Sequence, residues 1–558
     1  MLSGSTIQPH HSTSQLAMAP RSRSRYLERV GTSTLTSGCE VRPRSRRWDA
    51  AFLAVPVVVT VGIWLLFVCA RAPGTDAAWR SFPLDDAWIH LVYARSLAEN
   101  GGFAYNDGVP EAGMTSPLWV VLLAGIYPLA MRGGVDALVL GVKLVSLTFG
   151  IGVVVMLDRL CRDLGESRGV ALLAATLAAA NASLGFAAAS GMEVSLFIFL
   201  VLVALRSALR GRPVMTGIAA GLLAVARPEG LMLFPVYAAL LARREVRDQP
   251  HGRSQLVTAL LLGLAPALVY SAFCLHATGA PLPNTFYAKF VTPGPGALHH
   301  LAFGWRHYVH DNLGYFTIES GSMLCFLGLV RLIRRERLRG IAVVAVGALL
   351  FVGLTLSRNL APGHFFYWER WLIPSFPFFI LLMAMGLGEI HGGLMSLRPH
   401  VVEARPPAAV VWTTLAWAMG ALLLLPQPYL LRERFEQYAW NAQNMDEMNV
   451  TLGKWINTNL DEKAVIVVQD AGALRFLGQR TAIDLLGLND HQMLQYGLDR
   501  RLQVVRERGA RYVIIFPKLF DEDVLRSLNL VPVHSVQAAH YTICASPQDV
   551  MTVFRFDG

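Results

Sequence analysis

Charged residues are scarce in this chain of 558 residues. Asp, Glu, Lys and Arg make up 16% of it, whereas an ordinary soluble domain contains about 25%. The mean hydropathy is +0.43. Segment 51–70 has no charged residue at all, is long enough to cross a hydrocarbon core of about 30 Å, and is followed by similar runs. We therefore expect a polytopic α-helical membrane protein rather than a soluble one.

The sequence also shows no cysteine spacing typical of disulfides or zinc sites and no apolar core typical of a signal peptide. The six cysteines are scattered, so neither a disulfide framework nor zinc-binding spacing is visible. The first 48 residues lack an apolar core, and the segment after them is long enough to stay as an anchor, so we expect no signal peptide. The stretch "DAGALRFLG" lacks the full G-x-G-x-x-G fingerprint, which disfavours a dinucleotide site.

The positive charge is concentrated at the N-terminus. The net charge is 49 − 39 = +10, and residues 1–48 supply eight Arg against Glu28 and Glu40, which is +6 of that total. An arm of this kind keeps the N-terminus cytoplasmic and contacts anionic lipid. We predict a disordered basic cytoplasmic arm over 1–48 and no binding of nucleic acid.

Basic clusters indicate how often the chain crosses the membrane, because they stay on the cytoplasmic side. The clusters lie at 159–168, 206–212, 243–253, 331–339 and around Arg398. The run 118–131 is short and is expected to be a re-entrant or interfacial helix, and "RPEG" breaks two short helices. About eleven crossings then satisfy the charge rule: 51–70, 138–157, 170–189, 192–205, 214–226, 231–242, 256–275, 313–330, 341–356, 372–388 and 408–426.

This count assigns residues 49–428 to a transmembrane domain, with the first outer loop at 71–137. It places residues 429–558 outside a bacterial inner (plasma) membrane. The segments "AVIVVQ", "ARYVIIF" and "MTVFRF" in this last part are typical of strands, and "RRLQVVRER" is typical of a helix. We expect a small extracytoplasmic α/β domain there.

Two adjacent carboxylates follow the first span, in "SFPLDDAWIHLVYARSL". One aspartate is enough to cap the helix that the spacing of Ile89, Val92, Tyr93 and Leu97 predicts, and this helix is expected to lie along the outer membrane surface. The other carboxylate is then free to act as a general base on an acceptor hydroxyl. Asp85 is the first choice for that role and Asp86 the second.

Cations lie on the same predicted outer side. Lys289, Arg227 and Arg370 suggest an anionic ligand, and a lipid-linked phosphate is the natural candidate in a membrane. Structural pairing with Glu193, Glu229 or Glu369 is the competing interpretation. His90 lies four residues after Asp86, so a divalent cation is conceivable, although a hydrogen-bonded pair explains the spacing equally well.

The order of these motifs resembles one family. "DDAWIHLVYARSLAENGGFAYNDG", "GMTSPLW", "SGMEVSLF", "ARPEGLMLF", "PLPNTFYAKF", "YWERWLIPSFP" and "DAGALRFLGQRTAIDLLGLND" follow one another as in the GT-C superfamily of integral membrane glycosyltransferases. The chain is most similar to the branch with the terminal arabinofuranosyltransferases of the mycobacterial envelope. The resemblance implies a GT-C fold and an enzyme of cell-envelope biogenesis.

The resemblance also implies partners and roles. Such enzymes transfer a sugar with inversion from a polyprenyl-phosphate donor to an extracytoplasmic glycan, lipid or protein acceptor. The catalytic acid pair of the family corresponds to Asp85 and Asp86. The remaining residues expected at the substrate site hold the phosphate or orient the sugar and acceptor: Lys289, Arg370, Arg227, Glu193, Asn284, Tyr287, His90, Glu369 and Tyr367.

Other functions remain open from the residues alone. A multi-span transporter or flippase of lipid-linked glycans also needs many spans and polar residues at depth. Transporters tend to show broken helices in matching positions of two halves. Only the break near Arg227 is visible here, which favours the enzyme. An envelope polymerase or ligase and a membrane-anchored sensor are further alternatives.

Overall fold

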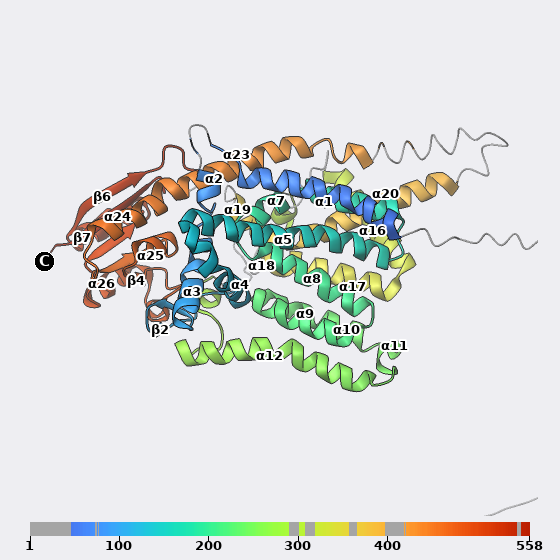
Figure 1. The fold of residues 1–558 in the computed structure, drawn as a ribbon, viewed down its shortest axis with the longest axis horizontal. Coiled ribbons are helices and arrows are strands. Elements are labelled where there is room, and N and C mark those ends of the chain that lie inside the picture. The colour runs from blue at the N-terminus through green and yellow to red at the C-terminus, as the bar shows by residue number, and fades with distance from the viewer. Residues whose placement is uncertain are drawn as a thin grey trace, which may run out of the picture. The chain divides into compact units, whose positions relative to one another are not determined.

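The structure, a computed structural model, describes residues 46–72, 75, 77–289, 301–306, 318–356, 365–396, 414, 418, 420–543 and 548–557. The chain divides into two compact units, Met1–Asp49 and Ala50–Gly558. Nearly all of the described residues belong to the second unit. Its apolar helices lie side by side, and a β-sheet lies beyond one end of them, next to α3 (Figure 1).

The helices up to residue 396 form most of the hydrophobic core. "RPEG" separates two short helices as predicted, because Arg227 adopts an extended conformation and a 3-10 turn follows at Pro228–Leu233. The helices are α1 (Arg46–Val68), α2 (Ala77–Arg80), α3 (Asp86–Asn100), α4 (Pro117–Ala130), α5 (Gly134–Asp163), α6 (Arg168–Ala180), α7 (Ala182–Ala189), α8 (Val194–Leu209), α9 (Pro213–Ala226), α10 (Phe234–Leu241), α11 (Arg244–Arg247), α12 (Gly252–Thr278), α13 (Asn284–Lys289), α16 (Ile318–Arg335), α17 (Arg337–Ala348), α18 (Leu354–Leu356), α19 (Phe365–Leu372) and α20 (Phe376–Ser396).

The described residues contain fewer membrane-length helices than the expected eleven. Four apolar stretches are long enough to cross: Pro117–Asp163, Gly252–Thr278, Arg337–Leu356 and Glu369–Gly393. The bent pair α6 and α7 makes a fifth if it counts as one span. Predicted crossings such as 192–205 and 214–226 fall in helices of 16 and 14 residues, shorter than the roughly 17 residues that a crossing needs. The predicted segments 313–330 and 408–426 lie partly outside the described residues.

The C-terminal part forms the expected α/β domain, and the three predicted strands and the predicted helix are confirmed. Five strands pair in the order β4-β3-β5-β7-β6, with β3, β4 and β5 parallel. Sequence patterns did not indicate β4 or β6. The strands are β3 (Val465–Val468), β4 (Thr481–Asp484), β5 (Tyr512–Ile515), β6 (Leu530–Gln537) and β7 (Val550–Phe556), and the helices are α23 (Gln427–Met445), α24 (Thr451–Asn459), α25 (Ala473–Gly478), α26 (Leu498–Glu507) and α27 (Glu522–Ser527).

The first outer loop attaches this domain to the helical part. A short hairpin of β1 (Ala104–Asn106) and β2 (Val109–Pro110) follows α3. The Asn106 side chain donates to the carbonyl of Ala482 at 2.8 Å and accepts from its N–H at 2.9 Å, so it satisfies part of the exposed edge of β4. The Tyr105 hydroxyl donates to the carbonyl of Ala471. Residues far apart in the chain are thereby fixed to one another.

Helix α3 differs from its predicted setting. Its helical range is as expected, but nearly every side chain of its first two turns is buried, including Trp88, Leu91 and Ala94. It packs against α4 on one side and against α25 of the C-terminal domain on another. It is therefore a buried helix between two parts of the molecule and not an amphipathic helix on a membrane surface.

A substitution at Gly472 can test how closely the C-terminal domain approaches α3. A Cβ at this position would overlap the carbonyl oxygen of Asp85 and lie 2.8 Å from the Cβ of Trp88. We expect Gly472→Ala to lower the stability of the protein by about 1–3 kcal/mol, as overpacking does. Thermal unfolding in detergent measures this, and Gly497→Ala is the control because its added methyl meets open space. Equal melting temperatures for the two variants would contradict the packing described.

Candidate active site

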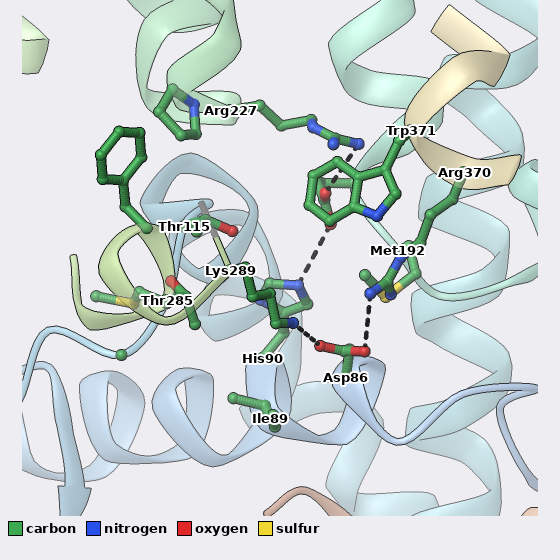
Figure 2. Close-up of a pocket in the computed structure, with 15 residues that line it drawn as sticks. Asp86, Ile89, His90, Thr115, Met192, Arg227, Thr285, Lys289, Arg370 and Trp371 are labelled. Atoms are coloured by element: carbon green, nitrogen blue, oxygen red, sulfur yellow. Dashed lines mark hydrogen bonds and ion pairs between the residues drawn. The ribbon is translucent and has the colours of Figure 1, made fainter. Parts of the chain in front are cut away.

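Asp86 holds two cations that come from distant parts of the chain. Its Oδ1 lies 3.1 Å from Nζ of Lys289, the last residue of α13, and its Oδ2 lies 3.0 Å from Nη2 of Arg370 in α19. Figure 2 shows both cations converging on the carboxylate at the start of α3. The structure therefore brings together three of the residues that the sequence placed in one site.

The charges at this point determine the protonation of Asp86. Burial by itself raises the pKa of this carboxyl, but the charges of Arg370 and Lys289 outweigh that effect and hold the pKa well below its ordinary value. Asp86 is thus an anion at neutral pH. A carboxylate with both oxygens paired to cations has little affinity for a further proton.

A small cavity beside Asp86 is lined by further charged groups. Nη1 of Arg227 lies 3.5 Å from Oε1 of Glu193, and Nε2 of His90 lies 3.3 Å from Oε2 of the same carboxylate. His90 therefore pairs with Glu193 and not with Asp86. Lys289, Arg370 and Arg227 all line this cavity, which also contacts Trp371 and Thr285 (Figure 2). Its walls carry three Lys or Arg cations against two carboxylates.

Arg227 also has the competing structural contacts. Its Nη2 lies 3.3 Å from Oε1 of Glu229, and its guanidinium lies 4.4 Å from the ring centre of Trp371. The side chain is nearly inaccessible to solvent at 2% exposure. Arg227 therefore fits both interpretations, because it forms structural ion pairs and it also lines the cavity.

Asp85 turns toward the C-terminal domain. Its Oδ2 accepts from the backbone N–H of Gly472 at 2.6 Å, and its Oδ1 accepts from that of Ala473 at 2.8 Å. It makes no side-chain cap to its own helix. Burial and the nearby charge of Asp470 raise the pKa of Asp85, while the two N–H bonds act in the opposite direction. Asp85, the first choice for the general base, thus caps α25.

A larger cavity adjoins the first. Its volume is about 270 Å³, against about 40 Å³ for the cavity beside Arg227. Asp86, Ile89 and Lys289 line both of them, so the two cavities meet at these residues. The larger cavity therefore offers more room for a group the size of a sugar. Its far wall belongs to the C-terminal domain.

Sequence reasoning missed that far wall. Asp470 lies two residues after the end of β3, and its Oδ2 accepts from Nδ2 of Asn449 at 2.8 Å. Asn449 also lies 3.4 Å from Oδ1 of Asp85. The signal was present in "VIVVQDAGALRF", where an acidic residue follows a buried parallel strand, a usual position for ligand-binding groups in α/β sheets.

Several predicted residues have other contacts. The Asn284 amide donates to Oε1 of Glu111 at 2.7 Å, and Tyr287 is exposed. Glu369 accepts from the Ser183 hydroxyl, and its Oε2 lies 3.4 Å from Nη2 of Arg434. The side chain of Tyr367 lies outside the described part. Among the residues that the structure describes, no three His, Cys, Asp or Glu side chains are grouped as around a metal ion, so no ligand set is assigned.

Known structures with a similar fold are membrane glycosyltransferases. The archaeal oligosaccharyltransferase AglB from Archaeoglobus fulgidus, solved with an inhibitory peptide and a dolichol-phosphate, has a TM-score of 0.56 at 14% identity over 84% of this chain and 69% of its own. ArnT from Cupriavidus metallidurans, bound to undecaprenyl phosphate, has a TM-score of 0.55 at 13% identity over 92% and 98%. The chain shares the fold of these proteins, and its long apolar helices support a membrane location.

Residues 436–554 match a domain of unknown function, DUF8728. The mycobacterial arabinofuranosyltransferase AftD has a TM-score of 0.46 at 15% identity over 92% of this chain and 42% of its own, which is too low to favour the arabinofuranosyltransferase branch. A search of curated protein sequences found no match.

The contacts of Asp85 predict a structural effect of its substitution. In Asp85→Asn, whichever way the amide turns, its NH2 group faces one of the N–H groups of Gly472 and Ala473 and leaves that donor unpaired. We expect a loss of about 1–3 kcal/mol of stability. Thermal unfolding measures it, with Glu462→Gln as an exposed control in the same domain. An unchanged melting temperature in Asp85→Asn would show that the cap on α25 contributes nothing.

Proposed function

We propose that this protein is a glycosyltransferase that moves a sugar from a polyprenyl-phosphate donor to an extracytoplasmic glycan, lipid or protein acceptor with inversion. The observation that carries the proposal is the convergence of Lys289 and Arg370 on Asp86, beside a cavity that Arg227 also lines. Two proteins of the same fold were solved with lipid phosphates, dolichol-phosphate in AglB and undecaprenyl phosphate in ArnT.

The donor phosphate fits the cation cluster. Lys289 and Arg370 each have an N–H group on Asp86, which fixes their positions before a ligand arrives. The free oxygens of the donor phosphodiester can accept charge-assisted hydrogen bonds from the same cations. As the bond to the sugar breaks, negative charge develops on the leaving phosphate, and fixed cations stabilise that charge. Arg227 supplies a further positive charge in the same cavity.

The sugar and the acceptor then occupy the larger cavity. The acid pair predicted from sequence lines it, and in this proposal the two carboxylates have different tasks. Asp86 orients the cations, and Asp85 holds the C-terminal domain against α3. The acceptor hydroxyl loses its proton to a carboxylate of this cavity. The shared fold favours such a transferase over the transporter or flippase alternative. The motif resemblance makes a pentofuranose one of the donor sugars to test.

The orientation in the membrane is part of the proposal. The N-terminus is cytoplasmic, the C-terminal domain is extracytoplasmic, and the membrane is a bacterial inner membrane. The lipid donor is then presented at the outer leaflet. The distribution of basic clusters supports this orientation.

Substitution of Arg370 tests the donor site. We expect Arg370→Gln to weaken binding of undecaprenyl phosphate by roughly 10–100-fold, because a hydrogen bond to a charged group contributes about 1.5–3 kcal/mol. Native mass spectrometry of the detergent-solubilised protein measures this binding. Arg432→Gln is the matched control, because its side chain is 79% exposed. Equal affinities for the two variants would remove Arg370 from the phosphate site.

Reporter fusions test the orientation. Alkaline phosphatase fused after Gly558 should be active, and green fluorescent protein at the same position should not fluoresce, because only the first folds outside the cytoplasm. Fusions truncated after Arg212 should give the reverse result, since 206–212 is a predicted cytoplasmic cluster. A fluorescent C-terminal fusion would place the sheet domain in the cytoplasm and contradict the proposed access of the acceptor.

A further inference from the structure

The carboxyl ends of three parallel strands form one wall of the larger cavity. Gln469 and Asp470 follow β3, Leu486 and Leu488 follow β4, and Phe516 follows β5, and all five line this cavity. In open α/β sheets, ligands bind in the crevice beyond these strand ends. The C-terminal domain therefore presents its usual binding edge to the acid pair of α3.

Asp470 is the carboxylate at this edge that is least committed to structure. Its one hydrogen bond described here is to Asn449, and the residue is partly exposed to the cavity. Asp86, in contrast, has both oxygens on cations, and Asp85 has both oxygens on the backbone of α25. Protonation of Asp86 would release the phosphate-binding cations, and protonation of Asp85 would weaken the attachment of the domain.

The position of Asp470 also suits an inverting reaction. Inversion requires attack on the sugar from the face opposite the leaving group. The proposed phosphate cations line the smaller cavity, and Asp470 lines the larger cavity but not the smaller one. A sugar at Asp86 and Lys289, where the cavities meet, would thus have phosphate on one side and Asp470 on the other.

We propose that Asp470, supplied by the C-terminal domain, is the general base that takes the proton from the acceptor hydroxyl. This assignment rests on the proposed glycosyl transfer. The acceptor oxygen forms the bond to the anomeric carbon, and its proton passes to the Asp470 carboxylate. The bond between the anomeric carbon and the phosphate oxygen breaks, and its electron pair leaves with the polyprenyl phosphate. Asn449 is a positioning residue that orients Asp470.

The surroundings of Asp470 suit proton transfer near neutral pH. Burial, opposed by the Asn449 hydrogen bond and reinforced by the charge of Asp86, raises the pKa of Asp470 to about 6. The titratable groups that line the cavity with it are Asp85 and Asp86 from α3, Lys289 from α13 and Tyr541 after β6. A base acts in its deprotonated form, so activity should fall as the pH drops through about 6.

The test uses the full-length protein in detergent or nanodiscs. The donors are polyprenyl phosphates that each carry one radiolabelled hexose or pentofuranose, and the acceptors are octyl glycosides. We expect Asp470→Asn to lower the transfer rate by at least about 100-fold. Its affinity for undecaprenyl phosphate and its melting temperature should stay at wild-type values. Glu462→Gln is the exposed acidic control.

A second variant separates a base from a structural carboxylate. Asn449→Ala removes the hydrogen bond that lowers the pKa of Asp470, so the acidic limb of the wild-type pH profile should move to higher pH. If the acidic limb of the pH profile of Asn449→Ala stays at the wild-type pH, the assignment is overturned. This outcome is decisive even if Asp470→Asn fails to fold. Near-wild-type transfer by a folded Asp470→Asn would overturn it as well. If the wild-type protein transfers no sugar from any donor, the proposed function fails, and this assignment fails with it.

Discussion

Two neighbouring carboxylates at the start of α3 face opposite parts of the molecule, and the site depends on this division. Asp85 accepts two backbone N–H groups of the C-terminal domain, and Asp86 pairs with Lys289 and Arg370 from the helical part. A single turn of backbone therefore fixes the distance between a cation cluster and the edge of a sheet. The burial of α3 between α4 and α25 makes that distance rigid.

The division also separates two electrostatic environments that a transfer reaction needs. Near Arg370 the positive charges keep Asp86 ionised and leave it with little proton affinity. Near Asp470 carboxylates outnumber cations and burial disfavours the charged form, so a proton is held more readily. In the proposed reaction, the first environment stabilises the leaving phosphate and the second accepts the hydroxyl proton. The two meet at Asp86 and Lys289, which line both cavities.

The sequence predicted features that depend on local pattern. The helical range of α3, the break at "RPEG" and strands β3, β5 and β7 follow from periodicity and from Gly and Pro positions. It also placed Asp86, Lys289 and Arg370 in one site, because charges in a membrane protein are costly unless they meet. The position of Asp470 after a parallel strand could have pointed to a ligand-binding group, but no pattern could show that Asp85 caps α25 or that Asp470 lies beside the acid pair. Those contacts join residues more than 380 positions apart and depend on docking alone.

The edge of the sheet has a consequence for how such a protein can change its acceptor. Three apolar side chains lie on the connections that follow strands β4 and β5: Leu486, Leu488 and Phe516. They line the larger cavity and not the smaller one, so they lie outside the cation cluster. In the proposed reaction, replacing these side chains alters the shape offered to the acceptor and leaves the residues proposed to bind the lipid phosphate unchanged. Under that proposal, acceptor choice and carrier choice can evolve independently within one chain.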